Sequence, residues 1–347
     1  MFNPRTKISV ISNGLNPPFD EGIKKFANQF VRALSNISGI VLQVIPIHAQ
    51  HGWLKRKLFL DLEIRRLLLK FSPNLVFYIP TSSGSLAAFL RFWILRSILG
   101  ASSGRAVMLL LQPNEAGYWG RILIRAFSPD LILTQSDAAY NYYASLQIPV
   151  DFTSAGVDVE EFAPSDGAVK ASLRKKYGFA EDDFIVLHVG HIKRSRNLES
   201  LASVSSKVGA KVVVVGSTST VQDQTLRTEL QDAGVRVYAE YVERIQEFYQ
   251  MADCYVFPTV LDTAAIGAPL SVLEAMACNL PVVTTKFGRL PKMFSEGDGF
   301  KYFDRESELS PSIGSFKIPV PIKTREMVLD YSWNRLVLDA ISKGSRT

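Results

Sequence analysis

Apolar residues in the first 150 positions form short continuous runs, and longer segments with helical spacing separate these runs. The runs have strand length and are apolar almost throughout, which is typical of strands buried on both faces. Between them apolar side chains recur every three or four residues, as at Ile23, Phe26, Ala27 and Phe30, which predicts helices. The predicted strands are residues 7–12, 40–47, 74–79, 106–112 and 131–134. The predicted helices are residues 22–34, 54–71, 86–99, 118–126 and 138–146.

A second series of the same kind begins after a loop-like stretch near residues 150–165 and a charged helix predicted over 169–177. Its predicted strands are residues 184–190, 211–216, 235–238, 254–258 and 281–285. Its predicted helices are residues 198–208, 221–233, 245–251 and 271–277. Strands and helices in alternation predict parallel sheets with helices on both faces. We therefore expect an α/β chain with two doubly wound sheets, and ligands bind outside the carboxyl ends of the strands in such sheets.

The length and composition agree with this organisation. A chain of 347 residues suits two cores, and no apolar run reaches the roughly 20 residues needed to span a bilayer. Met1 to Val10 are a short lead into a strand rather than a secretory signal. Cys254 and Cys278 both stand in apolar surroundings, so we predict buried core thiols instead of a disulfide. A cytoplasmic location is expected.

Charge is distributed unevenly between the two halves. Residues 1–150 hold 16 Lys and Arg against 7 Asp and Glu, a net charge of +9, whereas the remaining 23 and 26 give −3. A basic first half favours an anionic partner for that half. No zinc motif, basic helix-turn-helix or aromatic RNA-stacking signature is present, so nucleic acid is not the expected partner. An anionic membrane surface or a phosphate-bearing acceptor agrees better with the sequence.

A basic amphipathic stretch over residues 53–70 carries much of this excess charge. It either lies on an anionic bilayer, as a peripheral contact with the inner face of the membrane, or packs on the sheet as a surface helix through its leucines. A lipid-linked acceptor would favour the membrane alternative.

The segment 269–285 carries the strongest chemical signal. A helix is predicted to begin near Ser271, and its free N–H groups and dipole favour an anion such as a diphosphate. Ser271 is positioned to cap this helix, and Glu274 follows one turn later. The Glu274 carboxylate either accepts hydrogen bonds from the hydroxyls of a ribose or only complements the helix dipole. The residues alone leave both alternatives open.

At this point the sequence resembles family 4 glycosyltransferases, which are retaining enzymes with the GT-B fold. The run around Glu274 is similar to the donor-site signature of that family, and further similar segments follow in the same order. They are a glycine-then-basic loop at 189–197, an inter-domain segment at 156–162, a strand at 253–258, a turn at 287–291 and a last helix after Ser332-Trp333.

The resemblance implies two Rossmann-like domains facing a central cleft. The acceptor domain would comprise residues 1–155, completed by a C-terminal helix at 330–347, and the nucleotide-sugar donor domain would comprise residues 156–329. It also implies that Glu274 binds the ribose and that Lys193 and Arg196 hold the diphosphate and act in catalysis. The other donor-site positions implied by the matching motifs are Gly190, His191, Leu270 and Ser271.

The chain departs from the family pattern at several positions. Arg196 stands where the family usually has Lys, and His191 where it usually has Arg. Lys193 and Arg194 have the alternative of being simply solvated loop residues. The first Glu of the paired motif falls at Ile266, for which Asp262 or the backbone N–H groups of residues 267–270 would substitute.

Two candidates lie in the first half. The family often has a His after the third or fourth strand, but 78–81 and 111–115 contain none, so Glu115 is the candidate acid or base. Gly22 follows the first strand and opens a helix, where it would let the backbone approach the phosphates of the donor closely.

The resulting functional hypothesis is retaining transfer of a hexosyl group from a nucleotide sugar, UDP- or GDP-linked, in glycan, lipopolysaccharide or glycolipid biosynthesis. The resemblance to GT-B enzymes implies no metal, and the chain has no Asp-x-Asp motif of the kind that metal-dependent transferases use. No cofactor is expected besides the nucleotide sugar as substrate. The alternatives are an epimerase or phosphorylase of the same architecture, or a catalytically inactive accessory protein that retained the fold.

Overall fold

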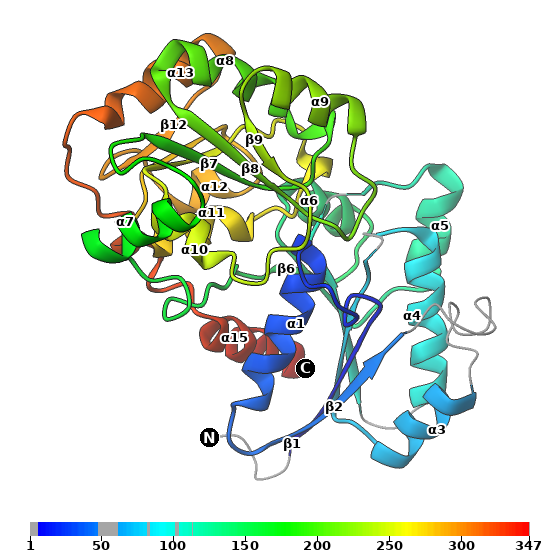
Figure 1. Ribbon diagram of the computed structural model, residues 1–347. Coiled ribbons are helices and arrows are strands. Elements are labelled where there is room, and N and C mark those ends of the chain that lie inside the picture. Colours follow the sequence, from blue (N-terminus) through cyan, green and yellow to red (C-terminus); the bar gives the residue numbers. More distant parts are fainter. Residues whose placement is uncertain (1–5, 48–61, 82–83, 101–103, 113, 347) are drawn as a thin grey trace. The chain divides into compact units, whose positions relative to one another are not determined.

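The computed structural model describes residues 6–47, 62–81, 84–100, 104–112 and 114–346. The chain divides into two compact units (Figure 1). Met1–Ser154 and Trp333–Thr347 form the first unit, and Ala155–Ser332 form the second. The chain therefore passes between the units twice, and its last helix belongs to the first unit.

The first unit is built on a six-stranded parallel sheet with the order β2-β1-β3-β4-β5-β6. The strands are β1 (Thr6–Ser12), β2 (Ile40–Pro46), β3 (Leu75–Ile79), β4 (Arg105–Leu110), β5 (Leu131–Thr134) and β6 (Val150–Phe152). All residues of β3 and β5 are buried, as their apolar runs predict. Strand β6 lies in the stretch predicted as loop, because its three residues pair only with β5 and show no apolar period of their own.

Helices cover both faces of this sheet. They are α1 (Gly22–Ser35), α3 (Leu62–Phe71), α4 (Leu86–Leu99), α5 (Tyr118–Ala126), α6 (Asp137–Ser145) and α15 (Trp333–Ser345). Figure 1 shows α1 and α15 side by side, where the rings of Phe26 and Trp333 meet edge to face at 5.4 Å. Helices α3, α4, α5 and α6 share the other face, where buried side chains such as Leu68, Phe92 and Ile124 join one apolar cluster. The terminal helix thus completes the core of the first unit.

The second unit has a second six-stranded parallel sheet, in the order β12-β11-β10-β7-β8-β9. Its strands are β7 (Ile185–Gly190), β8 (Lys211–Gly216), β9 (Arg236–Tyr238), β10 (Cys254–Phe257), β11 (Val282–Thr284) and β12 (Phe300–Tyr302). Alternate residues of β7 and β8 enter different apolar clusters, so Leu187 and Val213 pack on one face while Val186 and Val212 pack on the other. Both faces are therefore buried, which explains the continuous apolar runs.

The helices of the second unit lie on both faces of its sheet. The longer ones are α7 (Gly167–Lys176), α9 (Gln224–Asp232), α10 (Gln246–Met251), α11 (Leu270–Ala277), α13 (Glu306–Gly314) and α14 (Thr324–Val328). Two parallel sheets of this kind confirm the predicted α/β class with two Rossmann-like units. Cys254 and Cys278 are free and buried, which confirms their predicted place in the core.

The single helix predicted over 198–208 is wrong. Three short segments occupy it, namely η2 (Leu198–Leu201), α8 (Ala202–Val204) and η3 (Ser205–Gly209). The hydroxyls of Ser200, Ser203 and Ser206 each donate to the carbonyl three residues earlier, at 2.7, 3.4 and 3.2 Å. Serine side chains that bond back to the local backbone compete with regular helix geometry, which apolar periodicity does not reveal.

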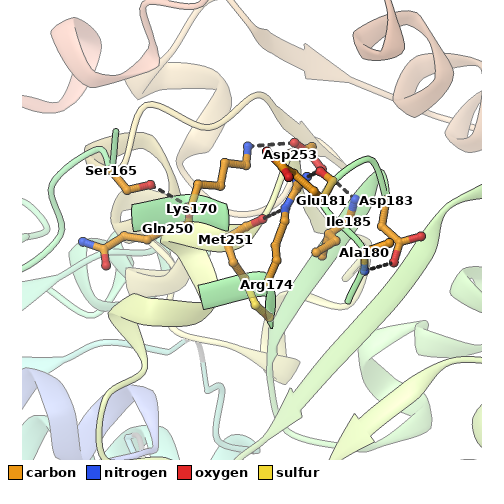
Figure 2. Close-up of polar contacts among 10 residues, drawn as sticks. All are labelled: Ser165, Lys170, Arg174, Ala180, Glu181, Asp183, Ile185, Gln250, Met251 and Asp253. Atoms are coloured by element: carbon orange, nitrogen blue, oxygen red, sulfur yellow. Dashed lines mark hydrogen bonds and ion pairs between the residues drawn. The ribbon is translucent and has the colours of Figure 1, made fainter. Parts of the chain in front are cut away.

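Asp253, just before β10, connects three elements of the second unit (Figure 2). Its carboxylate accepts from Arg174 Nη2 at 2.5 Å, from Lys170 Nζ at 2.7 Å and from the backbone N–H of Ile185 at 2.7 Å. Arg174 is buried and also donates from Nε to the Met251 carbonyl at 3.1 Å. Helix α7 is therefore attached to the starts of β7 and β10 by charge-assisted hydrogen bonds.

Candidate functional site

The basic loop predicted from residues 189–197 lies at the carboxyl end of β7, where ligands bind in sheets of this kind. Gly190 is the last residue of β7, and Arg194–Arg196 form the short helix η1. Asn197 closes this helix in the left-handed conformation with φ 55°, and its Nδ2 donates to the Pro258 carbonyl at 3.2 Å. The loop is thereby tied to the end of the neighbouring strand β10.

The three cations of this loop have different surroundings. Lys193 is exposed, and Arg194 is exposed and pairs with Glu229 at 2.7 Å. Arg196 is only 8% exposed, and its guanidinium carbon lies 5.9 Å from the centre of the Phe257 ring. A cation over an aromatic face in a poorly hydrated position interacts strongly with an anion. The structure thus singles out Arg196 from its neighbours.

His191, the residue in place of the expected Arg, is directed towards the loop after β8. Its Nδ1 lies 2.6 Å from the hydroxyl of Thr220. This contact connects the basic loop, in which His191 follows Gly190 directly, to the loop after β8.

His188, which the sequence analysis did not select, lies beneath Gly190. Its Nδ1 must donate to the Val256 carbonyl, 2.9 Å away, because a carbonyl oxygen only accepts. Burial lowers the pKa of His188 to about 4, so the ring is neutral at pH 7. Its Nε2 is buried without a hydrogen-bond partner.

Gly190 has a steric reason to lack a side chain. A Cβ atom at this position would lie 3.1 Å from Nε2 of His188 and 3.4 Å from Nη1 of Arg196. A larger residue would therefore press on both groups. The glycine predicted to give the backbone close access to a ligand also leaves room for these two side chains.

Helix α11 begins at Leu270, directly after Pro269, and no side chain caps its first turn. The prediction that Ser271 caps this helix is wrong, because Ser271 is its second residue. Its hydroxyl instead shares a hydrogen bond with Tyr255, whose own hydroxyl also reaches the Val189 carbonyl at 3.4 Å. Tyr255 thus joins the start of α11 to the end of β7, and brings the basic loop and the uncapped helix end together.

Glu274 is the fifth residue of α11 and is 4% exposed. Its Oε2 accepts a hydrogen bond of 2.9 Å from the hydroxyl of Tyr249 on α10. Burial, with the Glu274 carboxylate beside it, raises the pKa of Tyr249 well above 10, which keeps this donor protonated. The carboxylate is therefore held in a fixed orientation rather than exposed to solvent. Its role towards a ribose stays a prediction.

The segment before α11 is buried from Ala265 to Pro269 and includes Ile266, whereas Asp262 is exposed on η4 (Asp262–Ala264). Gly288, at φ +53°, passes so close to this segment that a Cβ would lie 2.3 Å from the Gly267 carbonyl oxygen. That oxygen accepts from the N–H of Arg289 at 3.0 Å. The turn at 287–291 thus supports the backbone that leads into the uncapped helix end.

Gly22 and Glu115 belong to the first unit. Gly22 is the first residue of α1, and Glu115 is exposed between β4 and α5.

Among the residues that the structure describes, no group of three or more His, Cys, Asp and Glu could hold a metal ion. Within the same ranges, none of the helices combines the length and the apolar character required to cross a membrane. Residues 53–61 of the basic stretch lie outside the described residues.

Comparison with known families identifies the segment that holds these residues. Residues 169–308 match the family "Glycosyl transferases group 1". The match contains the basic loop, Tyr249, Tyr255 and α11.

Curated relatives agree with this match. A D-inositol 3-phosphate glycosyltransferase of Paenarthrobacter aurescens is 26% identical over 175 residues, which are 47% of this chain and 41% of the relative. A putative glycosyltransferase, EpsD of Bacillus subtilis, is 27% identical over 166 residues, 45% of this chain and 42% of the relative. The similarity thus spans less than half the length of these two relatives.

Solved structures match nearly the whole chain. Sucrose-phosphate synthase of Thermosynechococcus elongatus has a TM-score of 0.75 at 15% identity, covering 97% of this chain and 98% of its own. Anabaena HepE in complex with UDP has a TM-score of 0.71 at 13% identity, covering 97% and 99%. The chain therefore has the GT-B fold, and a segment of its second unit is similar to glycosyl transferases of group 1.

Proposed function

We propose that this chain is a retaining glycosyltransferase of family 4, which transfers a hexosyl group from a UDP- or GDP-sugar to an acceptor. The observation that carries the proposal is the pairing of a buried cation, Arg196, with the uncapped start of α11 at one edge of the second sheet. A solved structure of HepE, which matches this chain in fold, contains UDP-glucose, and this supports the same class of donor here.

Breaking the bond between a sugar and a nucleotide diphosphate places negative charge on the leaving phosphate. Cations and free N–H groups that are already in position stabilise this charge best where water is scarce. Arg196 and the first turn of α11 supply such groups, and exposed Lys193 would add charge from the solvent side. The proposed chemistry requires neither a metal nor a cofactor.

Glu274→Gln should weaken donor binding about tenfold or more, because a hydrogen bond to a charged group contributes about 1.5–3 kcal/mol. Glutamine has the same shape and still accepts from Tyr249, so the melting temperature should hardly change. Calorimetric titration with UDP- and GDP-sugars measures the effect.

Asp262→Asn is the matched control, because Asp262 is exposed on η4 before the same helix. It should leave the donor dissociation constant within about twofold of the original. Equal donor affinity in Glu274→Gln and the unaltered chain would contradict the ribose-binding role. Absence of nucleotide-sugar binding in the unaltered chain would contradict the proposed function itself.

The first unit is proposed to hold an anionic acceptor, and buried Arg91 on α4 supports this. Arg91 is 7% exposed, its Nη1 donates to the Tyr78 hydroxyl at 3.3 Å, and its Nε is buried without a partner. Residues 64–114 contain no Asp or Glu. Within the part of the chain that the structure describes, no Asp or Glu forms an ion pair with Arg91, whose guanidinium contacts the Tyr78 hydroxyl. A buried guanidinium without a counter-charge is costly, and a phosphate of the acceptor would compensate it.

Arg91→Met should therefore lower the affinity for a phosphate-bearing acceptor about tenfold or more, since a charged hydrogen bond contributes about 1.5–3 kcal/mol. The free energy of unfolding should stay the same or rise, because a costly buried charge is removed. Titration with D-inositol 3-phosphate, the substrate named for one relative, and with inorganic phosphate provides the measurement.

Arg96→Met on the same helix is the control. Arg96 is half-exposed and pairs with Asp130 at 3.0 Å, so its loss should leave phosphate binding unchanged. Phosphate affinities that are equal in Arg91→Met and the original chain would exclude Arg91 as the anion-binding group.

Glu115, exposed before α5, is proposed as the acid or base that serves the acceptor hydroxyl. A lipid-linked acceptor in glycan, lipopolysaccharide or glycolipid assembly agrees with the basic first half.

Hydrolysis of the donor in the absence of an acceptor distinguishes the enzyme from an inactive accessory protein of the same fold. We expect slow hydrolysis for an enzyme and none for an inactive protein.

A further inference from the structure

Helix α5 (Tyr118–Ala126) presents its apolar side chains to the outside of the first unit. Tyr118 is 72% exposed, Trp119 76%, Ile122 48% and Leu123 43%, while Gly120 and Ile124 are the buried residues of this helix. At about 100° per residue, the exposed apolar side chains span an arc of about 140°. A surface helix of a soluble domain normally has the opposite arrangement.

The apolar surface continues onto helix α4. A Cβ on Gly120 would lie 3.3 Å from Leu86, and the Trp93 ring lies 5.1 Å from that of Phe127, just after α5. Leu86 and Trp93 are themselves 43% and 46% exposed and stand two turns apart on the same side of α4. Residues from two adjacent helices therefore form one patch, which consists of Leu86, Trp93, Tyr118, Trp119, Ile122 and Leu123. We call it the α4–α5 patch.

Positive charge predominates around this patch, and exposed Glu115 stands three residues before Tyr118. Arg121 and Arg125 are exposed on α5 beside the apolar arc, and no Asp or Glu occurs in residues 116–129. Helix α3, which packs on α4, adds exposed Arg65, Arg66 and Lys70. Figure 1 shows α3, α4 and α5 on one side of this unit.

We propose that the α4–α5 patch is a bilayer-docking surface that inserts into the interfacial region of an anionic membrane. Tyr and Trp favour the boundary between headgroups and acyl chains, because each has an apolar ring and a polar group. Ile122 and Leu123 enter the acyl boundary, and the flanking arginines contact lipid phosphates. The charge complementarity selects an anionic bilayer as the occupant.

This surface deepens the proposed function, since a lipid-linked acceptor is presented at a membrane. It differs from the predicted contact through residues 53–70 in that α5 supplies the inserted side chains. Its test uses no nucleotide sugar, so a failure of docking and a failure of glycosyl transfer are distinguishable.

The experiment is co-flotation of the whole chain with vesicles of phosphatidylglycerol and phosphatidylcholine, compared with vesicles of phosphatidylcholine alone. We expect binding to the anionic vesicles that weakens with salt, and at least tenfold weaker partition for Trp119→Ser/Ile122→Ser. The matched control is Ile318→Ser/Val320→Ser, which removes two exposed apolar side chains of the second unit and should leave partition unchanged. Circular dichroism and thermal melting verify that every variant is folded.

Brominated lipids locate the inserted residue directly. They should quench tryptophan emission of the original chain. Trp119→Phe should keep the partition and lose part of the quenching, and Trp93→Phe/Trp119→Phe should lose more of it, because both tryptophans belong to the patch. Four outcomes would overturn the proposal. They are no flotation of the original chain, unchanged partition of Trp119→Ser/Ile122→Ser, equal binding to neutral vesicles, and a concentration-dependent dimer that the α5 substitutions abolish in place of vesicle binding.

Discussion

Arg196→Ala should reduce the turnover of sugar transfer by about 10²–10³-fold, the loss typical when one pre-positioned charge-stabilising group is removed from an active site. Arg196 lies at the carboxyl end of the second sheet, 8% exposed, with its guanidinium over the Phe257 ring. Because little water competes there, its interaction with a leaving diphosphate is stronger than that of a surface cation. Turnover with saturating donor, measured by release of the nucleoside diphosphate, gives the result.

The chain offers a matched control two positions earlier. Arg194 has the same side chain in the same loop, but it is exposed and pairs with Glu229 at 2.7 Å. Exposed ion pairs contribute about 0–1 kcal/mol, so Arg194→Ala should change turnover little. Arg196→Lys should retain much of the activity, because lysine keeps the charge. Near-normal turnover of Arg196→Ala, or equal losses in the two alanine variants, would contradict the diphosphate-binding role.

Asp253→Ala should lower the free energy of unfolding of the second unit by about 3–5 kcal/mol, the effect expected when one partner of a buried ion pair is removed. Arg174, only 6% exposed, would lose its counter-charge, and the Ile185 N–H would lose its acceptor (Figure 2). The expected loss is large because α7, β7 and β10 all depend on this one carboxylate. Urea denaturation followed by circular dichroism measures it.

Asp304→Ala is the corresponding surface control. Asp304 pairs with Lys286 at 2.8 Å, but both side chains are more than half exposed, so the loss should stay below about 1 kcal/mol. Adding Arg174→Met to Asp253→Ala should recover part of the stability, since it removes the unpaired cation. Similar losses in Asp253→Ala and Asp304→Ala would show that the buried network contributes no more than a surface pair.

The order of strands and helices was largely determined by the sequence itself. Helix α5 has the predicted bounds of 118–126, and β8 has the predicted bounds of 211–216. Both follow from periodicity, because strands buried on both faces are continuously apolar and helices repeat every three to four residues. The short strands β6 and β12 were missed, since three residues are too few to show a period and pair only because a neighbouring strand is already in place.

The sequence also located the candidate site near Gly190 and Glu274, but it did not distinguish the residues within the site. Lys193, Arg194 and Arg196 are equivalent cations along the chain, and only the structure shows that Arg196 is the buried one. Tyr249 and Tyr255 occur as ordinary core aromatics, and their hydrogen bonds to Glu274 and Ser271 require α10, β10 and α11 to be packed together.

For the α4–α5 patch, too, the sequence predicted the helices and the tertiary structure decided which of their side chains are exposed. Periodicity predicted both helices but did not show which face of each is covered. Only the packing shows that α5 is anchored by Gly120 and Ile124, which leaves Tyr118, Trp119 and Ile122 outside. A sequence pattern states which residues share a helix face, but the neighbouring elements decide which face is covered. The sequence therefore predicted the buried strands, whereas the tertiary structure decided which side chains of these helices are buried and which are exposed.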